Sequence, residues 1–181
     1  SRANAMPLKG PGILEVPVSL GGFSAPGSVP IGTDFGYFGG GDTALSTVDR
    51  IDYSNDTATA PARGPLSLAR TRLTATGNTD FGYFGGGQSP GPVDRTTVDR
   101  IDYSNDTATA VAKGPLSVAR HRFGATGNAS FGYFGGGNPG QTSIVDRIDY
   151  SSDTATASVK GPLFASTYGT AATGNPSFGY F

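Results

Sequence analysis

Short stretches of alternating apolar and polar residues, separated by turns rich in glycine and proline, run along the chain after its first 34 residues. In one such stretch Ile101 and Tyr103 share a face of an extended chain. Arg100 and Asp102 share the opposite face. No window shows a convincing 3.6-residue period, so the pattern predicts strands rather than helices. Turn signals bound four predicted strands in this part of the chain, at residues 97–103, 107–112, 117–126 and 130–134.

Three phrases recur along the chain and indicate tandem repeats. Phe-Gly-Tyr-Phe begins at residues 35, 81, 131 and 178, Val-Asp-Arg-Ile-Asp-Tyr at 48, 98 and 145, and Gly-Pro-Leu at 64, 114 and 161. The chain therefore divides into an extension at 1–34, repeats at 35–80, 81–130 and 131–177, and the start of a fourth repeat at 178–181. In the extension, residues 13–20 are predicted to form an edge strand, because Pro17 is poorly suited to a central one.

One segment of each repeat varies in length, between the triple glycine and the Val-Asp-Arg phrase. It covers residues 42–47, 88–97 and 138–144. Surface loops tolerate length changes and packed strands do not, and in repeat proteins such insertions often gather on a binding face. We therefore place the candidate ligand contacts in these variable loops, at Asp42, Gln88, Asp94, Arg95, Asn138 and Gln141.

Arginine and aspartate recur at fixed positions of the repeat. We expect a ladder of Arg–Asp pairs that holds adjacent strands together, with aspartates also capping turns. A row of arginine donors for sugar or sulfate and a Ca²⁺ site on the clustered carboxylates are the alternatives. A second arginine recurs at Arg70 and Arg120, where the third repeat is expected to have Ser166. The predicted ladder comprises Arg50, Arg100, Arg147, Asp52, Asp102 and Asp149.

Composition and charge narrow the range of functions. The 29 glycines and 13 prolines suit short strands joined by tight turns. The 13 basic and 14 acidic residues give a net charge of -1 without a basic stripe, so nucleic acid is not an expected partner. There is no cysteine for disulfides or thiolate metal sites, and no long apolar run predicts a membrane-spanning helix. We expect neither a cofactor nor a metal.

The sequence does not indicate an active site. It has no Gly-x-Ser-x-Gly elbow, no zinc-type histidine pair and no phosphate loop. The sole histidine, His121, is expected at the surface rather than as a general base. Nearly identical repeats favour a repeated structural role, because catalysis needs one asymmetric constellation. Three positions fit the N-glycosylation acceptor pattern, at Asn55, Asn105 and Asn128.

The repeat resembles the kelch repeat of β-propellers. The similarity rests on Phe81-Gly82-Tyr83-Phe84 running into Gly85-Gly86, followed by Val98-Asp99-Arg100-Ile101-Asp102-Tyr103 and an arginine ahead of the next apolar strand. Ala-Thr-Ala stands where kelch repeats have a tryptophan. The resemblance implies an all-β fold of tandem four-stranded antiparallel repeats of about 47 residues, as blades of an incomplete ring or of a larger assembly.

The amino-acid sequence of the repeat is also similar to repeats in virion structural proteins of tailed phages that infect cyanobacteria. FGYFGGG, VDRIDYSNDTATA, GPLS and ATGN carry this similarity, which covers residues 32–181. It implies an external virion protein, such as a fibre or a host-contact component. We therefore expect a non-enzymatic structural protein, extracellular or on a virion surface, that contacts a host surface or glycan through its variable loops. A self-assembling, glycosylated cellular filament and a glycan-active propeller enzyme are the alternatives.

The number of repeats bears on the partners. Three units and part of a fourth do not close a propeller, which usually needs four to eight blades. Either the chain is part of a longer one, or several copies complete one assembly, or the units stack into an open array. Exposed sheet edges promote pairing with other strands. We therefore expect self-association, contact with other virion proteins, or both, with a cell-surface glycan as a further partner.

Overall fold

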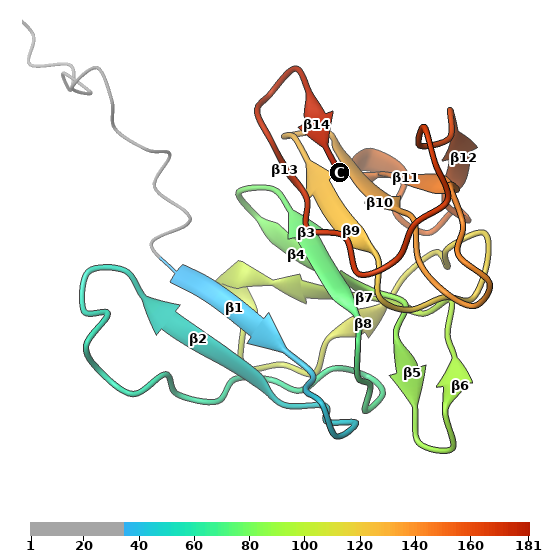
Figure 1. Ribbon diagram of the computed structural model, residues 1–181. Helices are drawn as coiled ribbons and strands as arrows, with labels where there is room; N and C mark the ends of the chain where they lie inside the picture. Colours follow the sequence, from blue (N-terminus) through green and yellow to red (C-terminus); the bar gives the residue numbers. More distant parts are fainter. Residues whose placement is uncertain (1–34) are drawn as a thin grey trace, which may run out of the picture.

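The structure, a computed structural model, describes residues 35–181. This part of the chain is all-β, as predicted, and its strands form several small antiparallel sheets (Figure 1). It also contains two short 3-10 helices, η1 (Tyr103–Asn105) and η2 (Tyr150–Ser152). Within residues 35–181 no helix is long and apolar enough to cross a membrane. The edge strand predicted at residues 13–20 lies outside the described residues.

Two four-stranded sheets form the body of the molecule, and in each the strands lie side by side in chain order. The second sheet consists of β3 (Thr74–Gly77), β4 (Phe81–Gly85), β7 (Val98–Asp102) and β8 (Val111–Ala112). The third sheet consists of β9 (Gly124–Gly127), β10 (Phe131–Gly135), β11 (Val145–Asp149) and β12 (Ser158–Lys160).

Smaller sheets flank this body. The first sheet pairs β1 (Phe35–Gly39) with β2 (Val48–Asp52), and an isolated bridge joins β2 to Ala62. A two-stranded piece at the other end pairs β13 (Thr173–Gly174) with β14 (Gly179–Tyr180). The hairpin β5 (Gln88–Ser89) and β6 (Val93–Asp94) projects from the connection between β4 and β7.

The three copies of Phe-Gly-Tyr-Phe that a Val-Asp-Arg-Ile-Asp phrase follows adopt the same strand register. In all three, the first Phe of Phe-Gly-Tyr-Phe lies opposite the second Asp of Val-Asp-Arg-Ile-Asp. The glycine between the aromatic residues makes room for the tyrosine that follows the neighbouring strand, because a Cβ on Gly82 would lie 2.7 Å from the hydroxyl of Tyr103. Identical sequence therefore gives identical local structure.

The sheets are offset from the sequence repeats by one strand, and several strands are shorter than predicted. Each four-stranded sheet begins with the strand that precedes Phe-Gly-Tyr-Phe, so a sequence repeat spans two sheets. Of the predicted strands 107–112 and 117–126, only Val111–Ala112 and Gly124–Gly127 pair as strands. The intervening backbone bonds elsewhere: the amide of Ala110 donates to Pro65 O, and that of Ser117 donates to the Asp146 carboxylate.

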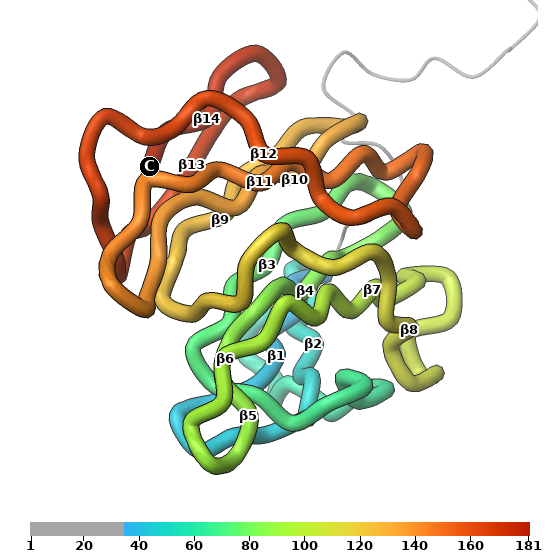
Figure 2. The backbone as a smooth tube through the Cα atoms, turned by 90° about the vertical axis from the view of Figure 1, so that its right-hand side faces the viewer, coloured from blue at the N-terminus to red at the C-terminus, as the bar shows by residue number. Residues whose placement is uncertain are grey.

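The apolar core lies between successive sheets. Figure 2 shows the sheets following one another in chain order, with β3 packed beside β9 and β9 beside β13. Two clusters of buried side chains fill the gaps, and each draws on two neighbouring sheets. One contains Val48, Leu66, Phe84, Ile101 and Ala110, and the other Tyr83, Val98, Leu116, Phe123, Phe134, Ile148 and Ala157. A single sheet therefore has no core of its own, as is usual in repeat proteins.

Candidate functional site

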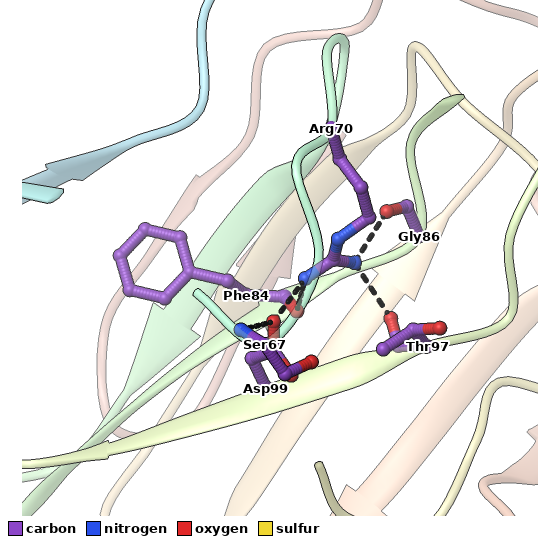
Figure 3. A network of polar contacts seen from close by, with 6 residues as sticks. All are labelled: Ser67, Arg70, Phe84, Gly86, Thr97 and Asp99. Carbon is purple, nitrogen blue, oxygen red and sulfur yellow. Dashed lines mark hydrogen bonds and ion pairs between the residues drawn. The ribbon is translucent and has the colours of Figure 1, made fainter. Parts of the chain in front are cut away.

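The recurring arginine ahead of each four-stranded sheet is buried (Figure 3). One Nη atom of Arg70 lies 2.7 Å from the Asp99 carboxylate, and the other donates to the carbonyls of Gly86 at 2.6 Å and Thr97 at 2.9 Å. Asp99 also accepts from the amide and hydroxyl of Ser67. Burial lowers the pKa of Arg70, and Asp99 opposes that shift. This ion pair joins the segment that precedes β3 to β4 and β7, so it stabilises the fold rather than facing a ligand.

A second copy of this cluster surrounds Arg120. Its guanidinium lies 2.9 Å from the Asp146 carboxylate and donates to Phe134 O at 2.9 Å. The backbone pairing of Thr167 with Thr142 shows that Thr167 takes the equivalent place in the third unit. The expectation of Ser166 there was wrong by one residue, because Gly-Pro-Leu and Phe-Gly-Tyr-Phe keep the same 17-residue separation in every unit.

Asp106 joins the first sheet to the second. Its carboxylate accepts from the hydroxyl of Tyr37 at 3.0 Å and from Arg50 at 2.8 Å, and Arg63 lies 3.5 Å away. Tyr37 stacks on Tyr103 with ring centroids 4.7 Å apart. Burial and then Asp106 raise the pKa of Tyr37, so its hydroxyl stays protonated and donates.

The same parts join the second sheet to the third. Asp153 accepts from the Tyr83 hydroxyl at 3.0 Å and from Arg100 at 2.8 Å, and Lys113 lies 3.4 Å away. Tyr83 stacks on Tyr150 at 4.7 Å. We call each such contact between successive sheets a joint.

The predicted ladder therefore needs a correction. Arg50 and Arg100 do pair with aspartates, but with those of the next unit. All three aspartates of the predicted ladder cap their own turns instead: Asp102 accepts from the amide and hydroxyl of Ser104, and this hydrogen bonding lowers its pKa. Asp52 and Asp149 do the same with Ser54 and Ser151. Arg147 has no aspartate partner within residues 35–181, and it stacks over the ring of Phe131 at 4.3 Å, as Arg50 and Arg100 stack over the equivalent phenylalanines.

The variable loops all connect equivalent strands, so they emerge at the same end of their sheets; we call this the loop end. Several predicted contact residues there bind their own neighbours. Gln88 is only 7% exposed and accepts from Arg72 at 2.7 Å, while Asp94 contacts Nδ1 of His121 at 2.6 Å. Arg95 donates to Ser89. Asn138 accepts from the amide of Gln141, which is exposed, as is Asp42.

His121 was expected at the surface and is instead 8% exposed. Its backbone pairs with Asn138, in the loop of the third sheet, while its ring contacts Asp94, in the loop of the second. The histidine therefore ties two adjacent variable loops together. Within residues 35–181 no group of three or more His, Asp or Glu side chains has the geometry of a metal site.

Sequence reasoning missed a strap of backbone hydrogen bonds across the loop end. The amide of Arg122 donates to Arg72 O at 3.0 Å, and that of Gly169 donates to Arg122 O at 2.7 Å. All three residues have a positive φ, 56° for each arginine and 69° for the glycine. Such a conformation costs an arginine free energy. Both arginine side chains are exposed. The repetition of an arginine two residues after Arg70 and Arg120 was the available signal.

The three N-glycosylation patterns differ in their surroundings. Asn55 and Asn105 are exposed at the end of the sheets opposite the variable loops. The side-chain oxygen of Asn128 accepts from two backbone amides, and its Nδ2 lies 3.4 Å from Pro176 O.

Comparisons with known proteins bear on the fold alone. No family model matches the sequence, and no curated protein is similar to it. Among solved structures, that of YjhT is similar, with a TM-score of 0.58 over 71% of this chain at 11% sequence identity. The chain spans 42% of the length of YjhT. At this identity, the likeness concerns the arrangement of strands and not the chemistry.

Proposed function

We propose that the sheets are kelch-like blades of a β-propeller, and that the protein is a non-enzymatic structural component of an extracellular or virion assembly. Its loop end contacts acidic glycans of a host surface. The meander order of the sheets and the fold likeness to YjhT support the propeller. The similarity of the repeat sequence to phage virion proteins supports the proposed role in an extracellular or virion assembly.

The observation that carries the binding role is the pair Arg72 and Arg122. Both are exposed, both adopt a left-handed backbone, and one strap holds their backbones together. Non-glycine residues with a positive φ concentrate at functional sites. Guanidinium groups recognise carboxylate and sulfate through paired N–H donors. A glycan bearing such groups is therefore the ligand class that this surface suits.

The test measures binding of the 181-residue chain to immobilised sulfated, carboxylated and neutral polysaccharides. We expect binding to the acidic glycans that weakens as salt rises. The double variant Arg72→Gln/Arg122→Gln should bind roughly a hundredfold more weakly or worse, because it removes two charged hydrogen-bonding groups that contribute about 1.5–3 kcal/mol each.

The matched control is Arg72→Lys/Arg122→Lys, which retains both charges and should keep part of the affinity. Circular dichroism melts show whether the variants remain folded. Equal binding to neutral and acidic glycans, or no loss in the Gln variant, would reject this role for the arginines.

A further inference from the structure

The third unit repeats the receiving half of a joint. In each filled joint a tyrosine, two basic side chains and a glycine surround the turn that carries the aspartate; we call this set a socket. The third socket has the same residue types at the same positions. The filled sockets are Tyr37, Arg50, Arg63 and Gly64, and Tyr83, Arg100, Lys113 and Gly114; the third is Tyr133, Arg147, Lys160 and Gly161.

The glycine of each socket indicates what packs into the socket. A Cβ on Gly64 would lie 1.8 Å from Ala108 O, and one on Gly114 would lie 1.8 Å from Ala155 O. Only glycine allows the next unit's turn to approach so closely. A Cβ on Gly161 would meet nothing within 4 Å. The third unit thus carries a glycine whose packing partner is missing among the described residues.

The charges of the third socket are also incomplete. Within residues 35–181, Arg147 has no carboxylate partner. Its counterparts Arg50 and Arg100 both have an aspartate at 2.8 Å. An open hollow lined in part by Tyr133, next to the strand β14, lies beside the socket.

The first unit presents the inserted half of a joint. We call residues 56–58, 106–108 and 153–155 the acidic turns; the latter two fill sockets. Asp56 is exposed and has no ion pair within the described residues. Tyr53, the counterpart of the stacked Tyr103 and Tyr150, is 62% exposed. The preceding residues 1–34 contain no tyrosine and one arginine, so their sequence does not repeat a socket.

We propose that a second copy of this chain inserts its acidic turn 56–58 into the third socket. Asp56 of the second copy accepts from Tyr133, Arg147 and Lys160, and its Tyr53 stacks on Tyr133. The amide of Gly161 donates to Asp56 O, as Gly64 and Gly114 donate to Asp106 O and Asp153 O at 2.8 Å in the filled joints.

The position of the second copy also follows from strand register. Its β1 occupies the place of β14, because both lie in a copy of Phe-Gly-Tyr-Phe and β13 pairs with β14 in the register in which β3 pairs with β4. β14 has two residues and is exposed, so it is easily replaced. The composite sheet takes β13 from one copy, and β1 and β2 from the next.

This contact is head to tail, since the first unit of one copy meets the third unit of another. Such contacts close into rings or extend into filaments, depending on the rotation between copies. The inference gives the proposed structural role its contact surface and rests on that role; the glycan contact at the loop end does not depend on it.

The test is sedimentation of the full 181-residue chain over a range of concentrations. We expect reversible association of the wild type. Gly161→Ala should remain monomeric at tenfold higher concentration, because its methyl group points into open space in the single chain but overlaps Ala58 O of the second copy. Its thermal unfolding as a monomer should match that of the wild type.

A charge exchange provides the matched control. Asp56→Arg and Arg147→Asp should each remain monomeric, since like charges then face each other. An equimolar mixture should associate as the wild type does, because it restores one contact by the reversed pair and the other by the native pair. Asp42→Arg, the same change in an exposed variable loop, should associate normally.

A wild type that stays monomeric at all concentrations would overturn the proposal, as would a mixture that fails to associate. Removal of residues 178–181 should strengthen association, and a loss of association would reject the strand replacement. Glycan binding by Gly161→Ala separates the two proposals. If only the proposed association through the third socket is wrong, this variant still binds acidic glycans.

Discussion

The joints and the loop end differ in how closely their contacts repeat from one unit to the next. At the joints Asp106 and Asp153 have matching partners, with two distances, 3.0 Å to tyrosine and 2.8 Å to arginine, identical in both. At the loop end the three connections differ in length, and each has its own internal contacts. Surfaces that must fit the next unit are constrained, while surfaces that face outward vary.

The largest expected effect comes from breaking the buried cluster around Arg70. Arg70→Met should lower the free energy of unfolding by about 3–5 kcal/mol, because it leaves Asp99 buried without its cation. Urea denaturation of the monomer measures this loss. The double variant Arg70→Met/Asp99→Leu should lose less than the single one. A single-variant loss below about 1 kcal/mol would contradict the buried pair.

The next effect compares two glycines of equivalent position. Gly114→Ala should lower the free energy of unfolding by about 1–3 kcal/mol, because its Cβ would press on Ala155 O and force two sheets apart. Gly161→Ala should leave the unfolding of the monomer unchanged, since it has open space. Equal losses in the two variants would mean that the backbone preferences of glycine and alanine, and not the joint, determine the loss of unfolding free energy.

Alkaline pH should weaken the joints before the loop end. Burial raises the pKa of Tyr103 and of Tyr150 from 10.0 to about 12. Between these values the unfolded chain releases protons that the folded chain retains, so stability is complete below pH 10 and falls as pH rises toward 12. Each tyrosine contributes up to about 1.4 kcal/mol per pH unit. Unfolding midpoints of Tyr103→Phe/Tyr150→Phe should depend less on pH across this window.

The smallest effect is expected at the variable loops. Asp42→Ala should change the free energy of unfolding by no more than about 0.5 kcal/mol, because the residue is exposed and makes no ion pair within the described residues. The same denaturation series measures it. A loss as large as that of Gly114→Ala would show that this loop supports the fold, and the contrast between the two regions would fail.

Sequence patterns predicted the all-β class and the location of the main strands, since Phe-Gly-Tyr-Phe and Val-Asp-Arg-Ile-Asp pair in every unit. They could not assign the partners of the charged residues. Asp102 and Asp106 both recur in the repeat, and spacing alone does not reveal that the first caps a turn while the second reaches the preceding sheet. The burial of His121 was equally invisible, because its aspartate partner lies in a loop that no other unit matches.

Because both joints use the same types of residue, any unit can pack against any other unit through the same contacts. A gene that lost or gained one repeat by unequal recombination would still encode a protein in which each socket followed by another repeat meets a matching acidic turn. Copy number could then drift without a folding defect at the new border, and lineages could differ in the length of the array. The few residues around Asp106 and Asp153 would be under strong purifying selection, while the loop end would be free to diversify.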